Sequence, residues 1–203
     1  MATQDLIVLC GVALSLGGVI HAIASIPHLN NSDPNSINNR LWTPLQVSFA
    51  LSFLLMGVGV LGVHLRQGDQ AGWLGLIGVG LASFGSLLTV TTSFMWGFVA
   101  PYLAHQAATP RAPNELLGPK GAIPGVFQLL LTYIFILLPG FILTGVVTIS
   151  AGVLPVWAGW LILVGIVVSQ PGNMVSRLAI LRNIGGVLFG IGLTWLGFAL
   201  ISG

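Results

Sequence analysis

Four histidines are the side chains of this sequence with the widest chemical range, because an imidazole can bind a metal or carry a proton. They are His21, His28, His64 and His105. His21 lies near the second end of the apolar run 6–26, and His28 follows seven residues later. Two helical turns would place both on one face if the helix continued past Pro27. The order of the apolar runs puts His105 on the same side of the molecule and His64 on the opposite side.

A shared cofactor is therefore restricted to three of these histidines. A helix of about 20 residues is about 30 Å long, so His64 cannot share a ligand with the others. His21, His28 and His105 are the candidate cofactor ligands, with a haem or chlorophyll on His21 alone, or a haem held by His21 and His105, as the alternatives. We favour the plainer interpretation, in which His21 bonds to a neighbouring helix and the other two lie at the headgroups. No cofactor is expected, and a tetrapyrrole is the alternative.

Other polar groups gather on the side of His21. Gln46 and Gln128 begin two apolar runs there, and Arg40 precedes one of them. These three residues are candidates for a polar pocket. The four carboxylates all fall outside the apolar runs. Proton-coupled transport usually depends on ionisable groups inside the membrane, so this class is not favoured.

No sequence pattern indicates an enzyme. The chain has one cysteine, Cys10, which rules out a metal site built on several thiolates. Nucleophile, phosphate-loop and zinc-protease patterns are missing from the sequence. We therefore expect no catalytic residue and no metal site.

The elements that position these residues follow from composition. Hydrophobic residues make up 55% of the chain and charged residues 5%, with a mean hydropathy of +1.00. Such a chain cannot cover a water-facing surface and needs lipid as its solvent. The net charge of +2 lacks the clustered cations of nucleic-acid binding. We predict an all-α, polytopic transmembrane helix bundle in a single domain. Its six spans are expected at 6–26, 42–63, 72–99, 126–149, 154–168 and 184–201.

Proline and glycine set the connections and the packing. The segment 101–124 holds five prolines and is predicted to be a connecting loop, since internal proline breaks a helix. The 28 glycines, including the Gly186–Gly190 pair, predict helices that approach closely. Pro139-Gly140 predicts a kink in the fourth span.

Two segments echo each other. In 71–79 and 158–166, six of nine aligned residues are identical. This allows a weak internal repeat that relates the second and third spans to the fourth and fifth, as in a duplicated carrier. We favour the simpler interpretation that Ala-Gly-Trp is a suitable start for a closely packed helix at a membrane interface.

Charge predicts the orientation. The loops after the first, third and fifth spans carry five cations, and the loop after the second carries only Arg66. These three loops are expected to face the cytoplasm, with both termini outside. Trp42, Trp73, Trp157 and Trp160 are expected in an aromatic belt. The membrane is predicted to be the bacterial inner (plasma) membrane or a specialised internal membrane.

A resemblance supports this architecture. Leu41-Trp42-Thr43-Pro44, the segments 71–78 and 153–160, and Gly186-Val187-Leu188-Phe189-Gly190 occur in this order. Together they resemble a widespread group of uncharacterised six-helix bacterial integral membrane proteins. Members carry His-Pro after the first helix and a histidine early in the second. Here Pro27-His28 reverses the first feature and Gln46 stands near the second. The resemblance implies the fold and no activity.

Three functions follow as hypotheses. The first is an accessory or structural membrane subunit that associates with other subunits, with a second copy of itself, or with lipid. The second is a carrier or binder of a small amphiphile near His21, His28, Gln46 and His105. The third is a pigment or haem protein that uses His21.

Overall fold

The chain folds entirely into helices and connecting segments over the part that the structure describes. This structure is a computed structural model, and it describes residues 3–27, 29, 33–107, 110–118, 126–174 and 176–203. No strand occurs among these residues. The predicted all-α class is confirmed.

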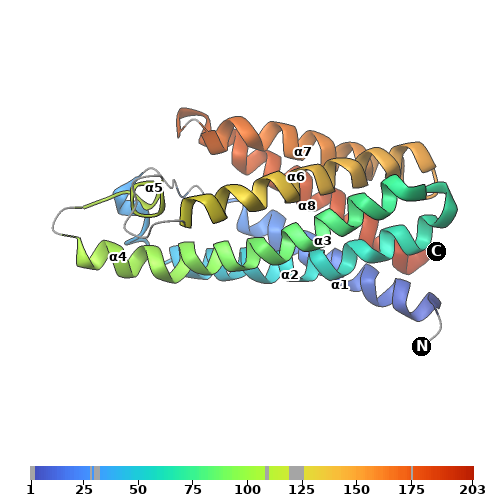
Figure 1. The fold of residues 1–203 in the computed structure, drawn as a ribbon, viewed down its shortest axis with the longest axis horizontal. Helices are drawn as coiled ribbons and strands as arrows, with labels where there is room; N and C mark the ends of the chain where they lie inside the picture. The colour runs from blue at the N-terminus through green and yellow to red at the C-terminus, as the bar shows by residue number, and fades with distance from the viewer. Residues whose placement is uncertain (1–2, 28, 30–32, 108–109, 119–125, 175) are drawn as a thin grey trace.

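Six long helices form the bundle (Figure 1). They are α1 (Thr3–Ala24), α2 (Trp42–Gln67), α3 (Gly72–Phe94), α6 (Val126–Ala151), α7 (Val156–Met174) and α8 (Ala179–Ser202). Within the described residues, five of these helices are long and apolar enough to cross a membrane, α3 being counted with its continuation, and α7 is a shorter apolar helix. The multi-pass membrane bundle is thus confirmed, while the sixth span stays a prediction.

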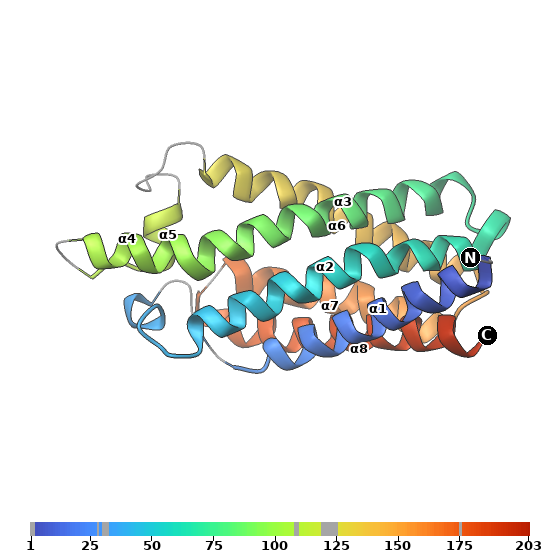
Figure 2. The same cartoon turned by 90° about the horizontal axis from the view of Figure 1, so that it is seen from below.

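Each long helix packs against the next in a closed ring. The order around the ring is α1, α2, α3, α6, α7 and α8, and α8 returns to α1. Both termini lie at one end of the bundle, as Figures 1 and 2 show, and α4 (Ala100–Gln106) and α5 (Pro113–Leu117) lie at the other. Short 3-10 turns lie between the helices, namely η1 (Pro34–Ser36), η2 (Gly68–Gln70) and η4 (Ser176–Leu178).

Glycine explains how closely the helices approach. A Cβ added to Gly59 in α2 would lie 2.5 Å from the backbone nitrogen of Leu14 in α1. A Cβ on Gly140 in α6 would collide with the backbone nitrogen of Ala82 in α3. No larger side chain fits at these crossings, so glycine permits the packing, as the composition predicts.

The third helix is longer than the sequence analysis expected. α3 continues through the π-helical turn η3 (Met95–Val99) into α4, so that helix persists to Gln106. Helix α5 also falls inside the segment 101–124 that was predicted to be a loop. That prediction is corrected: the loop begins later and contains a helical turn.

Side chains from the start of α2 explain why Pro101 does not end the helix. Proline has no N–H to donate to the carbonyls of Trp96 and Gly97, one turn earlier. The indole N–H of Trp42 donates to the Trp96 carbonyl at 2.8 Å, and the Thr43 hydroxyl donates to the Gly97 carbonyl at 2.9 Å. Trp42 is accordingly 1% exposed, so its predicted place in an aromatic belt is wrong.

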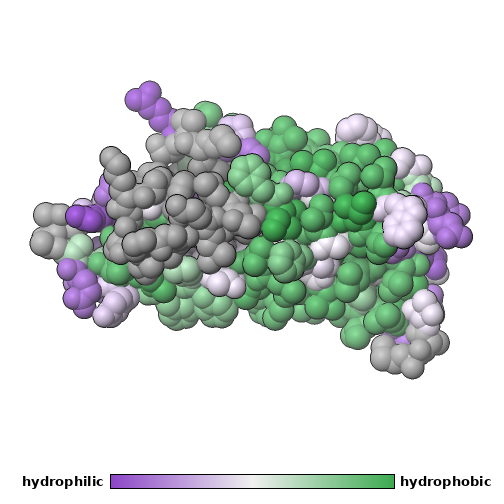
Figure 3. All heavy atoms as spheres, viewed as in Figure 1, coloured by the Kyte–Doolittle hydropathy of each residue, from purple (hydrophilic) through white to green (hydrophobic). Residues whose placement is uncertain are grey.

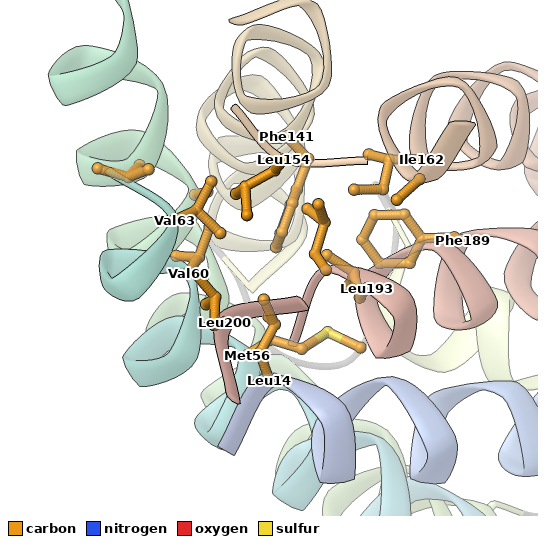
Figure 4. Packing of buried hydrophobic residues seen from close by; sticks show 14 of the residues in the cluster. Leu14, Met56, Val60, Val63, Phe141, Leu154, Ile162, Phe189, Leu193 and Leu200 are labelled. Atoms are coloured by element: carbon orange, nitrogen blue, oxygen red, sulfur yellow. The ribbon is translucent and has the colours of Figure 1, made fainter. Parts of the chain in front are cut away.

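Among the described side chains, the larger apolar cluster lies in the half of the ring near the termini. Figure 4 shows side chains of α1, α2, α6, α7 and α8 pointing toward one another there. Leu14, Val60, Ile162 and Leu193 are fully buried within this cluster. The helices are thus held together by close apolar packing at one end, and the other end is built differently.

The outer surface is suited to lipid. Hydrophobic side chains cover the middle of the face seen in Figure 3, and hydrophilic residues gather at its two ends. Trp73 is 79% exposed and Trp157 is 71% exposed, as an aromatic belt at the termini end requires. The surface therefore has the polarity pattern of a bilayer-spanning bundle.

Candidate functional site

A large cavity occupies the half of the ring that the core leaves unfilled. Its volume is about 1090 Å³, near the upper limit of about 1,000 Å³ for typical small-molecule pockets. All six long helices contribute to its wall. Its floor consists of residues that also belong to the apolar core, namely Phe53, Leu137, Phe141, Ile166 and Phe189.

Short elements close the cavity at the end of the bundle. Leu117 of α5 is 1% exposed and packs with Trp42 and Ala100 in a second apolar cluster. Leu29, which follows α1, also packs against this cluster. Leu29, Trp42 and Leu117 line the cavity as well. The described residues thus place an apolar cover between the cavity and the water-facing end.

Exposed side chains in the cavity wall indicate an opening between α6 and α7. These helices separate toward the α4–α5 end in both Figure 1 and Figure 2. Their close contact lies near the connection between them, where a Cβ on Gly145 would meet Leu163 at 2.9 Å. Closer to the start of α6, Phe135 and Ile142 line the cavity and are 75% and 38% exposed. We call this opening, bordered by Phe135 and Ile142 of α6 and by Gln170 of α7, the α6–α7 seam.

His21 stands in the wall beside the floor. Its ring is buried and meets the rings of Phe49, Phe53 and Phe189 edge to face, each at a centroid distance of 5.3 Å. Its Nδ1 lies 3.3 Å from the Ser52 hydroxyl. These contacts hold the ring in one orientation, so His21 combines a packing role with a polar edge on the cavity.

Hydroxyl and amide groups make the remaining polar wall. They belong to Ser25, Gln46, Thr89, Thr92, Ser93, Ser169, Gln170 and Asn183. Several hydroxyls donate to a carbonyl of their own helix, as Thr89 does to Gly85 and Ser169 does to Ile166, both at 2.8 Å. Such bonds satisfy the donor and leave the hydroxyl oxygen able to accept another bond. The wall can therefore accept hydrogen bonds as well as donate them.

Arg182 and Asn183 join α8 to the end of α1. The Arg182 guanidinium donates to the carbonyl of Leu29, and its Nε donates to the Asn183 side-chain oxygen at 3.4 Å. The Asn183 amide donates to the carbonyls of Ile26 and Pro27 at 3.5 and 3.4 Å. Carbonyls at a helix end lack helical donors, so this pair caps the exit of α1.

The structure places some of the predicted site residues in the cavity wall and others outside it. His21 and Gln46 line the cavity. His105 in α4 and Arg40 before α2 are exposed and do not line it. His28 lies outside the described residues, and of Gln128 only the helical backbone is described. Of the four expected residues whose side chains are described, the cavity thus brings together two, His21 and Gln46.

Arg182 is a charged cavity residue that the sequence analysis did not assign to the site. It was counted only among the cations of a predicted cytoplasmic loop. The structure places it in the first turn of α8, which begins at Ala179, five residues before the expected start of the sixth span at Ile184. The signal was present as a single Arg-Asn pair immediately before a glycine-rich apolar run. The comparison with family models, curated proteins and solved structures finds no match for the chain.

Proposed function

We propose that this multi-pass membrane protein binds a small amphiphile in the cavity and exchanges it with the bilayer through the α6–α7 seam. The observation that carries the proposal is a polar-walled cavity that is covered at the end of the bundle and open at its side. A water-soluble ligand would need an opening at the covered end. An amphiphile needs an opening toward lipid.

The chemistry of the wall suits a molecule with two parts. Aromatic and aliphatic side chains form the floor and the seam, where an acyl chain or ring system would lie. Hydroxyls, amides and Arg182 line the rest, where a headgroup would bond. Pockets that are mostly apolar with a few convergent polar groups are typical of small-molecule sites.

The sixth span and the orientation belong to the same proposal. α7 packs between α6 and α8 in the ring, which supports the proposal that it crosses the membrane with them. Six crossings leave both termini on one side, which agrees with their position at one end of the bundle. The excess of basic residues at the α4–α5 end supports an orientation with the cavity toward the cytoplasm and both termini outside.

The other two functions stay predictions. An accessory subunit would associate with other membrane proteins, and recovery of the solubilised protein as a lone monomer would argue against it. A tetrapyrrole on His21 would give the purified protein a visible absorption band, and a spectrum without such a band would argue against it.

Filling the seam tests the proposal. Ile142→Trp puts a large ring at the opening, and we expect the fraction of protein that retains an added monoacylglycerol to fall about fivefold, equivalent to about 1 kcal/mol. Native mass spectrometry of the detergent-solubilised protein measures this fraction.

Val146→Trp is the matched control. Val146 lies one turn further along α6 and is 46% exposed, and it does not line the cavity. This variant should retain the lipid as the unaltered protein does. Equal retention by both tryptophan variants and the unaltered protein would refute binding through the seam.

A further inference from the structure

Arg182 gives the cavity a charge that no acidic side chain of the chain balances. None of the chain's four carboxylates, at Asp5, Asp33, Asp69 and Glu115, lines the cavity. Arg182 does line it, and is partly buried in the wall. Removing a cation from water without an anion nearby is costly, because neutral dipoles replace its hydration only in part. The cavity wall therefore contains a cation and no carboxylate to balance it.

The hydrogen bonds of Arg182 to described residues use only part of its donors. A guanidinium has five N–H groups in a planar fork. In the described part of the chain, two bonds are formed, one to the Leu29 carbonyl and one to the Asn183 side chain. Both acceptors are uncharged. The fork is the geometry that binds carboxylate and phosphate through paired hydrogen bonds.

The position of Arg182 along its helix fits a headgroup. It is the fourth residue of α8, about 5 Å along the axis from the helix start at 1.5 Å per residue. The start of a helix carries a partial positive charge, which adds to that of the guanidinium and favours an anion. Ile166 and Phe189, deeper in the same cavity, leave the acyl part an apolar path.

We propose that the amphiphile bound in the cavity is anionic, with its carboxylate or phosphate on Arg182 and its apolar part directed to the floor and the α6–α7 seam. This inference rests on the proposed function and adds the class of headgroup. The Gln46 amide, on the α2 wall of the same cavity, supplies a further uncharged donor for the headgroup. A fatty acid and an anionic phospholipid share this chemistry and differ in chain number.

Two tryptophans in the wall allow a direct test. Trp42 and Trp96 line the cavity, so a brominated ligand bound there quenches their fluorescence. The full chain is placed in nanodiscs of phosphatidylcholine and titrated with dibromostearate, its methyl ester, or brominated phosphatidylglycerol, at a pH where the acid is ionised. We expect saturable quenching by an anionic probe at an about tenfold lower mole fraction than by the ester, as one charge-assisted pair would give. Trp96→Phe should reduce the saturable part.

The variants separate charge from structure. Arg182→Gln should remove the preference for the anion, so that acid and ester quench at similar mole fractions, whereas Arg182→Lys should keep part of the preference. Arg177→Gln is the matched control, because Arg177 is an exposed cation at the same end of the bundle and does not line the cavity. It should keep the full preference.

The outcomes distinguish the two proposals. Equal saturable quenching by acid, phosphatidylglycerol and ester would overturn the anionic headgroup and leave amphiphile binding intact. An absence of saturable quenching by every probe would overturn both. If Arg182→Gln does not fold, the comparison of the probes on the unaltered protein still decides, and a preference for the acid over phosphatidylglycerol, or the reverse, identifies the source of the anion.

Discussion

At the scale of single residues, His21 is held by aromatic contacts on several sides. Three phenylalanine rings from α2 and α8 meet it edge to face, and Ser52 lies at its Nδ1. Edge-to-face pairs add stability beyond the area that they bury. The ring is thus a structural part of the wall between core and cavity.

Replacing the His21 ring should lower the free energy of unfolding, and the loss should depend on how much of the ring is removed. We expect His21→Ala to reduce the free energy of unfolding by about 2 kcal/mol, because it leaves a hole among the three rings. His21→Phe keeps an aromatic ring and should recover most of the loss. Thermal unfolding in detergent, followed by circular dichroism, measures both. Identical midpoints for the two variants and the unaltered protein would show that these contacts contribute little.

Sequence reasoning reached part of this site. His21 and Gln46 were recognisable because a polar side chain within an apolar run is rare. Arg182 was not, because a cation near a helix end is explained equally well by a cytoplasmic loop. Only the return of α8 to the end of α1 shows that this guanidinium lies in a cavity wall, and that contact joins residues 153 positions apart.

At the scale of the elements, small residues decide which helices pair. Gly59 meets the Leu14 backbone, Gly140 meets Ala82, and a Cβ on Gly165 in α7 would lie 2.5 Å from the Phe189 nitrogen in α8. Lipid gives no hydrophobic drive to helix association, so such close packing must hold the ring. The abundance of glycine predicted this packing, but not which pairs of helices it joins.

A methyl group at one of these crossings should be destabilising. Gly59→Ala places a Cβ 2.5 Å from a backbone atom, and overpacking of this kind costs about 1–3 kcal/mol. Gly80→Ala is the control, since a Cβ there would have no neighbour within 4 Å. Unfolding by sodium dodecyl sulfate in mixed micelles compares the stabilities of the two variants. A Gly80 variant as unstable as the Gly59 variant would contradict the packing account.

The continuation of α3 into α4 shows where a prediction from local sequence fails. Proline at 101 predicts a helix end, since it removes a donor and crowds the preceding turn. The helix continues because Trp42 and Thr43 supply donors from a segment more than fifty residues away. Their role could not be read from the sequence, in which a tryptophan at a helix start indicates a membrane interface. For the two Ala-Gly-Trp segments, the internal repeat stays the alternative to the favoured interpretation of a closely packed helix start.

At the scale of the whole molecule, the ring of helices is packed at one end and hollow at the other. Apolar side chains fill the half near the termini, and a cavity of about 1090 Å³ occupies the rest. Composition predicted the membrane bundle, because so few charges cannot cover a soluble surface. It could not predict the cavity, because the same apolar residues serve as core, as lipid contact or as cavity floor according to where each helix faces.

The central claim is that lipid-derived molecules occupy this cavity, and photo-crosslinking tests it most directly. A diazirine-bearing fatty acid is incorporated into nanodiscs with the full chain, irradiated, and mapped by peptide mass spectrometry. We predict adducts on the cavity residues Leu138, Ile166 and Gln170 that decrease when unlabelled fatty acid is added. Adducts confined to outward-facing residues such as Leu74, Phe84 and Phe198, with no decrease on competition, would contradict the account.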